Sequence, residues 1–222
     1  MTVDIRALVF DFDGLILETE TPAYQSWAEI YREHGHEIPM DKWHDYLGSD
    51  RGFSPVEHLA ALVGEGLDVA VTQKRRDARK DELVLALDVM EGVRDYVADA
   101  KRLGLKLGVA SSSSRAWVVG HLERLGIHEH WDAVRTRDDV KLPKPAPDVY
   151  RAVVLALGVR PEEALALEDS PNGVAAAKSA GLRCVAVPNA LTQDLDLSGA
   201  DLRLRSLADL SLGALLASLE RD

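Results

Sequence analysis

Short, nearly continuous apolar runs recur along the chain and alternate with segments of helical periodicity. The apolar runs occupy residues 5–10, 105–110, 164–167 and 184–187. Such runs are typical of strands that are buried on both faces of a parallel sheet. The helical segments are 92–103, 116–125, 148–157 and 173–180, and each is followed directly by a glycine, a frequent residue after the last helical turn. This alternation predicts an α/β fold with a doubly wound parallel sheet.

Residues 19–87 break this rhythm, because they contain several aromatic residues and no strand-like run. Three segments, 23–34, 55–62 and 71–87, have the periodicity of amphipathic helices. The first and second predicted strands are therefore too far apart for an ordinary crossover. We expect a core domain formed by residues 1–18 and 88–222, with a small helical domain, 19–87, inserted after the first strand.

Composition narrows the class of protein further. Hydrophobic residues make up 46% of the 222, which is enough for an ordinary core. The net charge of −11 and the 5% of aromatic residues argue against a nucleic-acid partner. No window approaches the roughly 20 apolar residues of a membrane span, and Cys184 alone can form neither an internal disulfide nor a thiolate metal cluster. We expect a cytoplasmic monomer without a membrane partner.

Polar residues gather where the predicted strands end, which is where open α/β sheets bind their ligands. Four such features follow one another along the chain: Asp11-Phe12-Asp13-Gly14, Ser111, Lys144-Pro145 and Glu168-Asp169. Each of them alone is common in turns. Together, in this order and in these strand contexts, they predict one catalytic site.

Phosphoryl transfer explains this set of residues. A phosphomonoester is dianionic, so a carboxylate nucleophile approaches it only with a divalent cation between them. Asp11, the backbone carbonyl of Asp13 and Asp169 offer the oxygen ligands that Mg²⁺ prefers. Glu168 is a further ligand or a group that orients the others. Because neither thiolates nor paired histidines lie nearby in the sequence, Mg²⁺ is favoured over zinc.

The other residues have matching roles. Asp11 is the expected nucleophile, and Asp13, two residues further on, would protonate the leaving alkoxide and then deprotonate the attacking water. Lys144 offers a compact cation to the phosphate or the nucleophile. The serine loop that begins with Ser111 offers a hydroxyl and backbone N–H groups at a helix start, which favours an anion and adds Ser112 as a substrate-binding candidate.

These features resemble the motifs of the haloacid dehalogenase superfamily, in its phosphatase and phosphomutase branch. The four matching segments, in motif order, are Asp11-Phe12-Asp13-Gly14, Val109-Ala110-Ser111, Lys144-Pro145-Ala146-Pro147-Asp148 and Leu167-Glu168-Asp169-Ser170. The resemblance implies a Rossmann-like core, an α-helical cap inserted after the first motif, and magnesium-dependent chemistry through an aspartyl-phosphate on Asp11. Asp13 favours phosphoryl transfer over carbon–halogen cleavage, because the dehalogenases lack that acid.

The cap is expected to select the substrate. Arg51 resembles the cap-loop arginine of sugar-phosphate mutases and hexose-phosphate phosphatases, and Glu20 is a candidate for the cleft beside Asp13. Ala23 stands where β-phosphoglucomutases carry a histidine, which counts against a mutase. We therefore expect a phosphatase acting on small phosphorylated metabolites, sugar or polyol phosphates. The alternatives are a β-phosphoglucomutase-like phosphomutase and, less favoured, a non-catalytic phospho-acceptor or phosphometabolite-binding module.

Overall fold

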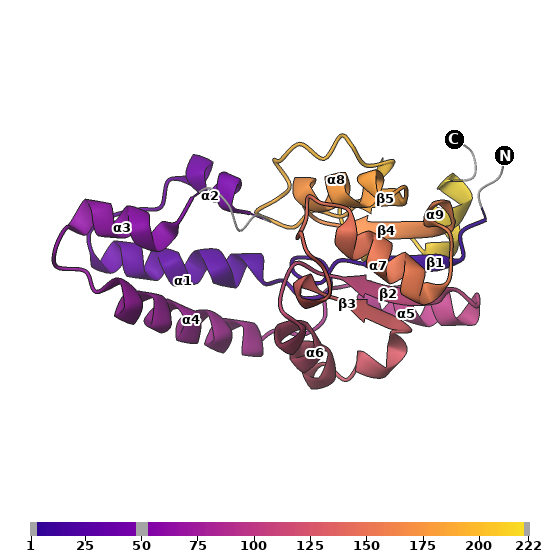
Figure 1. The fold of residues 1–222 in the computed structure, drawn as a ribbon, viewed down its shortest axis with the longest axis horizontal. Coiled ribbons are helices and arrows are strands. Elements are labelled where there is room, and N and C mark those ends of the chain that lie inside the picture. Colours follow the sequence, from indigo (N-terminus) through magenta and orange to yellow (C-terminus); the bar gives the residue numbers. More distant parts are fainter. Residues whose placement is uncertain (1–3, 48–52, 220–222) are drawn as a thin grey trace. The chain divides into compact units, whose positions relative to one another are not determined.

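The computed structural model describes residues 4–47 and 53–219 of the chain (Figure 1). The chain forms two compact units: Met1–Leu17 together with Asp88–Asp222, and Glu18–Leu87. We call the first the core unit and the second the helical unit, and describe each by itself.

The core unit is built on one sheet of parallel strands in the order β3-β2-β1-β4-β5-β6 (Figure 1). The strands are β1 (Ala7–Phe10), β2 (Lys106–Ala110), β3 (Ala133–Arg135), β4 (Ala164–Glu168), β5 (Arg183–Ala186) and β6 (Leu202–Arg203). Every residue of β1 and β4 is buried, in agreement with the apolar runs 7–10 and 164–167; the last residue of β4, Glu168, is buried as well. The predicted α/β fold with a parallel, Rossmann-like sheet is confirmed.

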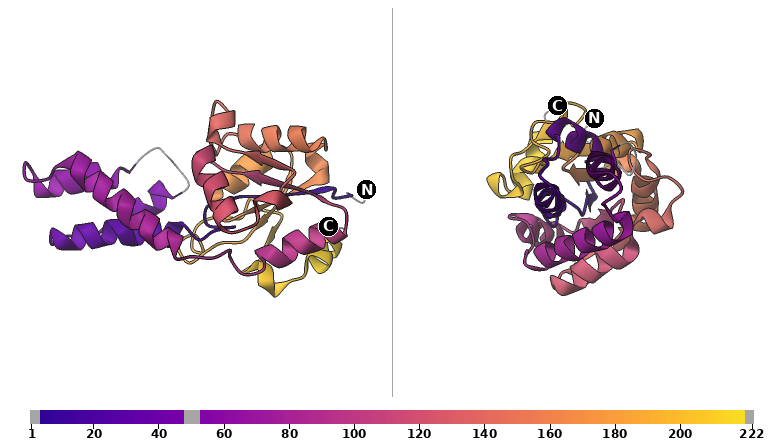
Figure 2. Two further views of the ribbon diagram at one scale, coloured as in Figure 1. Left: turned by 90° about the horizontal axis from the view of Figure 1, so that it is seen from below. Right: turned by 90° about the vertical axis from the view of Figure 1, so that its left-hand side faces the viewer.

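Helices cover both faces of this sheet (Figure 2). The helices of the core unit are α5 (Val93–Arg102), α6 (Arg115–Arg124), α7 (Asp148–Leu157), α8 (Pro171–Ser179) and α9 (Leu212–Leu219), with 3-10 turns at His128–His130, Arg137–Asp139, Pro161–Glu163 and Leu207–Asp209. On one face, α7 and α8 pack on small strand residues such as Ala7, Val9 and Ala166 in one buried cluster. The small side chains of Ala7 and Ala166 let the helices come close to the strands.

The register of the central strands sets the position of the site. β1 lies between β2 and β4, with Phe10 opposite Val109 on one side and Leu167 on the other. The residues at and just after the carboxyl ends of these strands therefore meet at one edge of the sheet. Those residues are Asp11, Ser111, Glu168 (the last residue of β4) and Asp169.

The helical unit consists of α1 (Glu20–Glu33), α2 (Met40–Tyr46), α3 (Pro55–Val63) and α4 (Val69–Leu85). Trp27 and Trp43 are buried in it. Arg79 of α4 forms an ion pair with Glu29 of α1 at 2.8 Å, and the two helices pack side by side. Among the described residues, no helix of either unit has the length and apolar character needed to cross a membrane.

Candidate active site

A buried ion-pair network lies at the carboxyl ends of β1 and β4. The Lys144 ammonium is 2.6 Å from Asp11 Oδ1 and 2.7 Å from Glu168 Oε1. Asp11 and Lys144 are each 7% exposed and Glu168 is fully buried. A charge removed from water in this way is stable only when it is paired and hydrogen-bonded, as these three groups are. The structure thus brings together three of the residues that the sequence singles out.

Local structure explains how each group is held. The backbone N–H of Phe12 donates to the same Asp11 oxygen, Oδ1, at 2.7 Å. Glu168 ends β4, so its side chain enters the buried interior, where the Tyr150 hydroxyl of α7 donates to Oε1. The backbone N–H of Asp169 donates to Oε2 of Glu168 at 3.2 Å. Both carboxylates are therefore fixed in orientation.

The carboxylates of this network outnumber its one ammonium group, Lys144. Burial, and then the Glu168 carboxylate, raise the pKa of Asp11 to about 8, although Lys144 acts in the opposite direction. Burial would lower the pKa of Lys144, but the Asp11 and Glu168 carboxylates raise it above its usual range. One ammonium therefore faces an excess of negative charge, because Asp169 lies beside the same groups.

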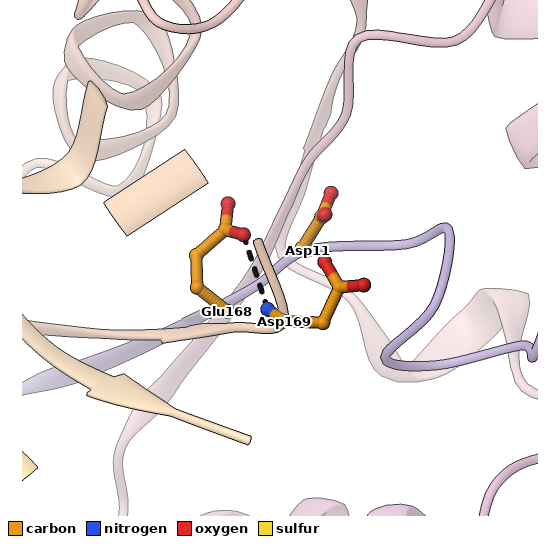
Figure 3. Close-up of side chains that lie close together, drawn as sticks. All are labelled: Asp11, Glu168 and Asp169. Carbon is orange, nitrogen blue, oxygen red and sulfur yellow. Dashed lines mark hydrogen bonds between the residues drawn. The ribbon is translucent and has the colours of Figure 1, made fainter. Parts of the chain in front are cut away.

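Three carboxylates form a cluster that could hold a metal ion. Asp11, Glu168 and Asp169 each place an oxygen so that all three lie within 4.8 Å of one another, and all three residues are buried (Figure 3). Carboxylate oxygens without sulfur or imidazole are the donor set that suits Mg²⁺. The excess negative charge in the same buried space also favours a bound cation. The residues present fit a magnesium site.

Asp169 has a support that the sequence analysis missed. The Asn189 side-chain amide donates to Asp169 Oδ2 at 2.8 Å and to the Gly14 carbonyl at 3.4 Å. A Cβ at Gly14 would lie 2.2 Å from Asp169 Oδ2, and Gly14 has a φ of +80°. Only glycine fits this turn without strain, for reasons of both space and backbone conformation.

Asp13 faces the loop after β2. Its Oδ2 accepts hydrogen bonds from Ser113 Oγ at 2.6 Å and Ser111 Oγ at 3.3 Å. Its Oδ1 accepts one from the indole N–H of Trp117 at 2.9 Å. Ser112 has a different partner: its hydroxyl accepts a hydrogen bond from the backbone N–H of Lys144 at 3.2 Å. This bond connects the loop after β2 to the loop that carries Lys144.

The sequence offers two substrate-binding candidates within residues 18–87, Glu20 and Arg51. Glu20 is the first residue of α1, where its backbone N–H bonds to the Glu18 side chain at 3.0 Å. Arg51 lies outside the described residues. Their proposed roles in substrate binding stay predictions.

Trp117, Tyr150 and Asn189 escaped the sequence analysis, and Ser113 entered it only as part of the serine loop, without a role for its side chain. Asn189 follows β5 closely, so the rule that polar residues after strands form the site could have found it. A buried tyrosine needs a partner for its hydroxyl, which was a signal for Tyr150. Trp117 belongs to a helix, and nothing in its sequence context distinguishes it from a packing residue.

Comparison with known proteins identifies the family of the chain. The model of the "Haloacid dehalogenase-like hydrolase" family matches residues 8–187. The chain is 44% identical over 216 residues to "Putative phosphatase YhcW" of Bacillus subtilis (strain 168), covering 97% of this chain and 98% of that protein. It is 30% identical to "Validoxylamine A 7'-phosphate phosphatase" of Streptomyces hygroscopicus subsp. limoneus, covering 92% and 95% of the two chains.

A solved structure is similar over nearly the whole chain. It is a crystal structure of a variant of CbbY from Rhodobacter sphaeroides in complex with xylulose-(1,5)bisphosphate, with a TM-score of 0.74 and 31% identity. The match covers 95% of this chain and 99% of that one. The resemblance drawn from the sequence motifs is confirmed, and so is the prediction of an enzyme. The chain belongs to the haloacid dehalogenase-like hydrolase family, within its group of phosphatases.

Proposed function

We propose that the protein is a magnesium-dependent phosphatase that hydrolyses small phosphomonoesters, sugar or polyol phosphates, through an aspartyl-phosphate on Asp11. The observation that carries this proposal is the buried cluster in which Lys144 bridges Asp11 and Glu168, with Asp169 close by. Such a cluster has a nucleophile, a fixed cation and oxygen ligands within one small space. These are the parts that phosphoryl transfer requires.

Asp11 performs the first step. Its Oδ1 is held by Lys144 and the Phe12 N–H, so we assign the attack on phosphorus to the other oxygen, Oδ2. The new bond joins Oδ2 to phosphorus, and the bond from phosphorus to the ester oxygen breaks. Asp11 and Asp169 would hold magnesium, with Glu168 as a further ligand or as the group that orients Lys144. When bound, the ion supplies the positive charge that lets a dianionic ester approach carboxylates.

Asp13 moves the proton in both steps. It gives a proton to the leaving alkoxide, and then takes one from the water that attacks the phosphorus of the aspartyl-phosphate. The second attack breaks the bond between phosphorus and Asp11 and releases inorganic phosphate. Ser111 lies within hydrogen-bond distance of Asp13, at 3.3 Å, and its hydroxyl would contact the phosphoryl group during transfer.

We assign the choice of ester to the helical unit, acting as a cap, with Arg51 and Glu20 as substrate-binding candidates. Sugar phosphates are favoured because a relative and a structural neighbour carry phosphorylated carbohydrates in their names, validoxylamine A 7'-phosphate and xylulose-(1,5)bisphosphate. The cytoplasmic location and the monomeric state stay predictions from the sequence.

The test is a panel of hexose, pentose and polyol phosphates, phosphoglycolate and p-nitrophenyl phosphate, assayed for phosphate release with Mg²⁺ and with excess EDTA. We expect Mg²⁺-dependent release concentrated on a few sugar or polyol phosphates, and none from the Asp11→Asn variant. β-Glucose 1-phosphate is assayed for isomerisation as well. Isomerisation with little free phosphate, or release that persists in EDTA, would contradict the proposal.

A further inference from the structure

Trp117 makes a contact with the acid/base residue that goes beyond packing. Its indole Nε1 is 2.9 Å from Asp13 Oδ1, within the core unit. The two serines of the same loop bind the other oxygen, Oδ2. The donors thus divide the carboxylate between them, the indole on one oxygen and the hydroxyls on the other.

The indole itself is firmly placed. Trp117 is in the first turn of α6, where its backbone N–H donates to the Ser114 side chain, the helix cap, at 3.3 Å. One turn further along α6, the His121 ring packs against the indole edge-to-face, with centroids 4.3 Å apart. His121 in turn stacks on Phe12, the residue between the two catalytic aspartates, at 6.4 Å. The N–H is therefore aimed at Asp13 by a packed scaffold.

The chemistry of an indole makes this contact informative. An indole N–H donates a hydrogen bond and cannot accept one, whereas a serine hydroxyl can do both. Toward the indole, Oδ1 of Asp13 therefore serves as an acceptor. A proton carried by Asp13 is favoured on Oδ2, where the hydroxyls of Ser113 and Ser111 can accept a hydrogen bond from it.

We propose that Trp117 is a positioning residue for the general acid: it fixes the plane of the Asp13 carboxylate and favours the transferable proton on Oδ2. This rests on the proposed function, in which Asp13 protonates the leaving alkoxide. Without the indole, the carboxylate can rotate about its Cβ–Cγ bond, and the proton can occupy either oxygen. In a smaller fraction of the enzyme–substrate complexes, the proton of Asp13 then points toward the leaving oxygen.

The dependence of kcat/KM on the leaving group distinguishes a positioning role of Trp117 from a general loss of active-site structure. The parameter kcat/KM reports steps up to departure of the leaving group. An alkoxide requires protonation, whereas p-nitrophenolate leaves without it. We expect Trp117→Phe to lower kcat/KM for alkyl phosphates by about 10-fold, part of the roughly 10²-fold or more that general acid catalysis supplies. The loss for p-nitrophenyl phosphate should be much smaller, so that kcat/KM depends more steeply on leaving-group basicity.

Trp131→Phe is the matched control. Its indole packs edge-to-face on Phe10 at 5.2 Å, and its N–H has no hydrogen-bond partner among the described residues. The same substitution there removes an indole N–H that does not contact Asp13. Any loss in this variant should be equal for alkyl and aryl esters.

The hydrogen bond between the Trp117 indole and Asp13 can also be detected by NMR, without an assay of enzyme activity. The four tryptophans give four indole signals in an ¹⁵N-labelled spectrum, and Trp117→Phe identifies one of them. Asp13→Ala should move that signal to the position of an indole without a hydrogen bond, and leave the signal of Trp131 in place. An unmoved Trp117 signal would overturn the proposal.

The kinetic outcomes separate this inference from the proposed function. Equal losses on alkyl and aryl esters, or faster hydrolysis of alkyl esters by Trp117→Phe, would overturn the positioning role in an enzyme that still hydrolyses phosphate esters. A wild-type protein that hydrolyses no ester on the panel would overturn the proposed function, and this assignment with it.

Discussion

The substitution Gly173→Ala should disturb the active site, because the added methyl group would collide with the Glu168 carboxylate. Gly173 lies in the first turn of α8, directly against Glu168. A Cβ at this position would lie 1.8 Å from Glu168 Oε2 and 2.0 Å from its Cδ. Glu168 is fully buried, and Lys144 and Tyr150 hold its carboxylate. The contact must open by about 1.5 Å to reach ordinary van der Waals separation, so either Glu168 or the start of α8 has to move.

The expected cost follows from that displacement. Overpacking of this size costs about 1–3 kcal/mol, and weakening the hydrogen bonds to a charged carboxylate costs about 1.5–3 kcal/mol. Alanine in a helix returns about 0.5–1 kcal/mol relative to glycine. We expect Gly173→Ala to lower the free energy of unfolding by about 2–4 kcal/mol. Because Lys144 shifts with Glu168, kcat/KM should fall by about 10²-fold.

Gly120→Ala provides the control, since Gly120 lies within α6 and a Cβ there would meet nothing within 4 Å. This variant should be more stable than the wild type by about 0.5–1 kcal/mol and equally active. Urea unfolding gives the free energies, and phosphate release from the best ester gives kcat/KM. A Gly173→Ala protein as stable and as active as Gly120→Ala would refute the close approach of α8 to Glu168.

Three further predictions concern the charges and the metal. Lys144→Met leaves Asp11 and Glu168 without their ammonium, so urea unfolding at neutral pH should show a loss of about 3–5 kcal/mol; an unchanged free energy of unfolding would contradict this. Asn189→Ala removes the amide that holds Asp169, and calorimetric titration should show Mg²⁺ affinity about 10-fold weaker, whereas unchanged affinity would remove Asn189 from the site. In the wild type, burial and Glu168 raise the pKa of Asp11 to about 8, so protons compete with Mg²⁺ below that pH. The same titration should therefore show affinity that rises with pH and levels off above about 8, and an affinity that is constant over this range would speak against Asp11 as a ligand.

The strands of the sheet were predictable where they are buried on both faces and therefore have apolar sequences. β1, β2, β4 and β5 lie inside the sheet and consist of apolar runs, so their positions could be predicted to within two residues at each end. The edge strands β3 (Ala133–Arg135) and β6 (Leu202–Arg203) escaped notice, because three and two residues are too few to show a pattern. Helix α2 was missed for the same reason, being only 7 residues long.

The site was predictable in its sequence order but not in its supporting contacts. Asp11, Ser111 and Glu168 could be found because the carboxyl ends of parallel strands meet at one edge. The partners of these groups come from helix faces and later loops. The orientation of Trp117 toward Asp13 depends on how α6 packs, which no local pattern in the sequence reveals.

The most direct test of the central claim is a search for phosphate bound covalently to Asp11. The Asp13→Asn variant should be mixed with a ³²P-labelled aryl phosphate and Mg²⁺ and quenched in acid. The aryl group leaves without a proton, while hydrolysis of the aspartyl-phosphate lacks its base, so the intermediate accumulates. The account predicts base-labile label in the peptide that contains Asp11, and none when Asp11→Asn is added to the same variant. Phosphate release without labelled protein, or label that persists in the Asp11→Asn protein, would contradict it.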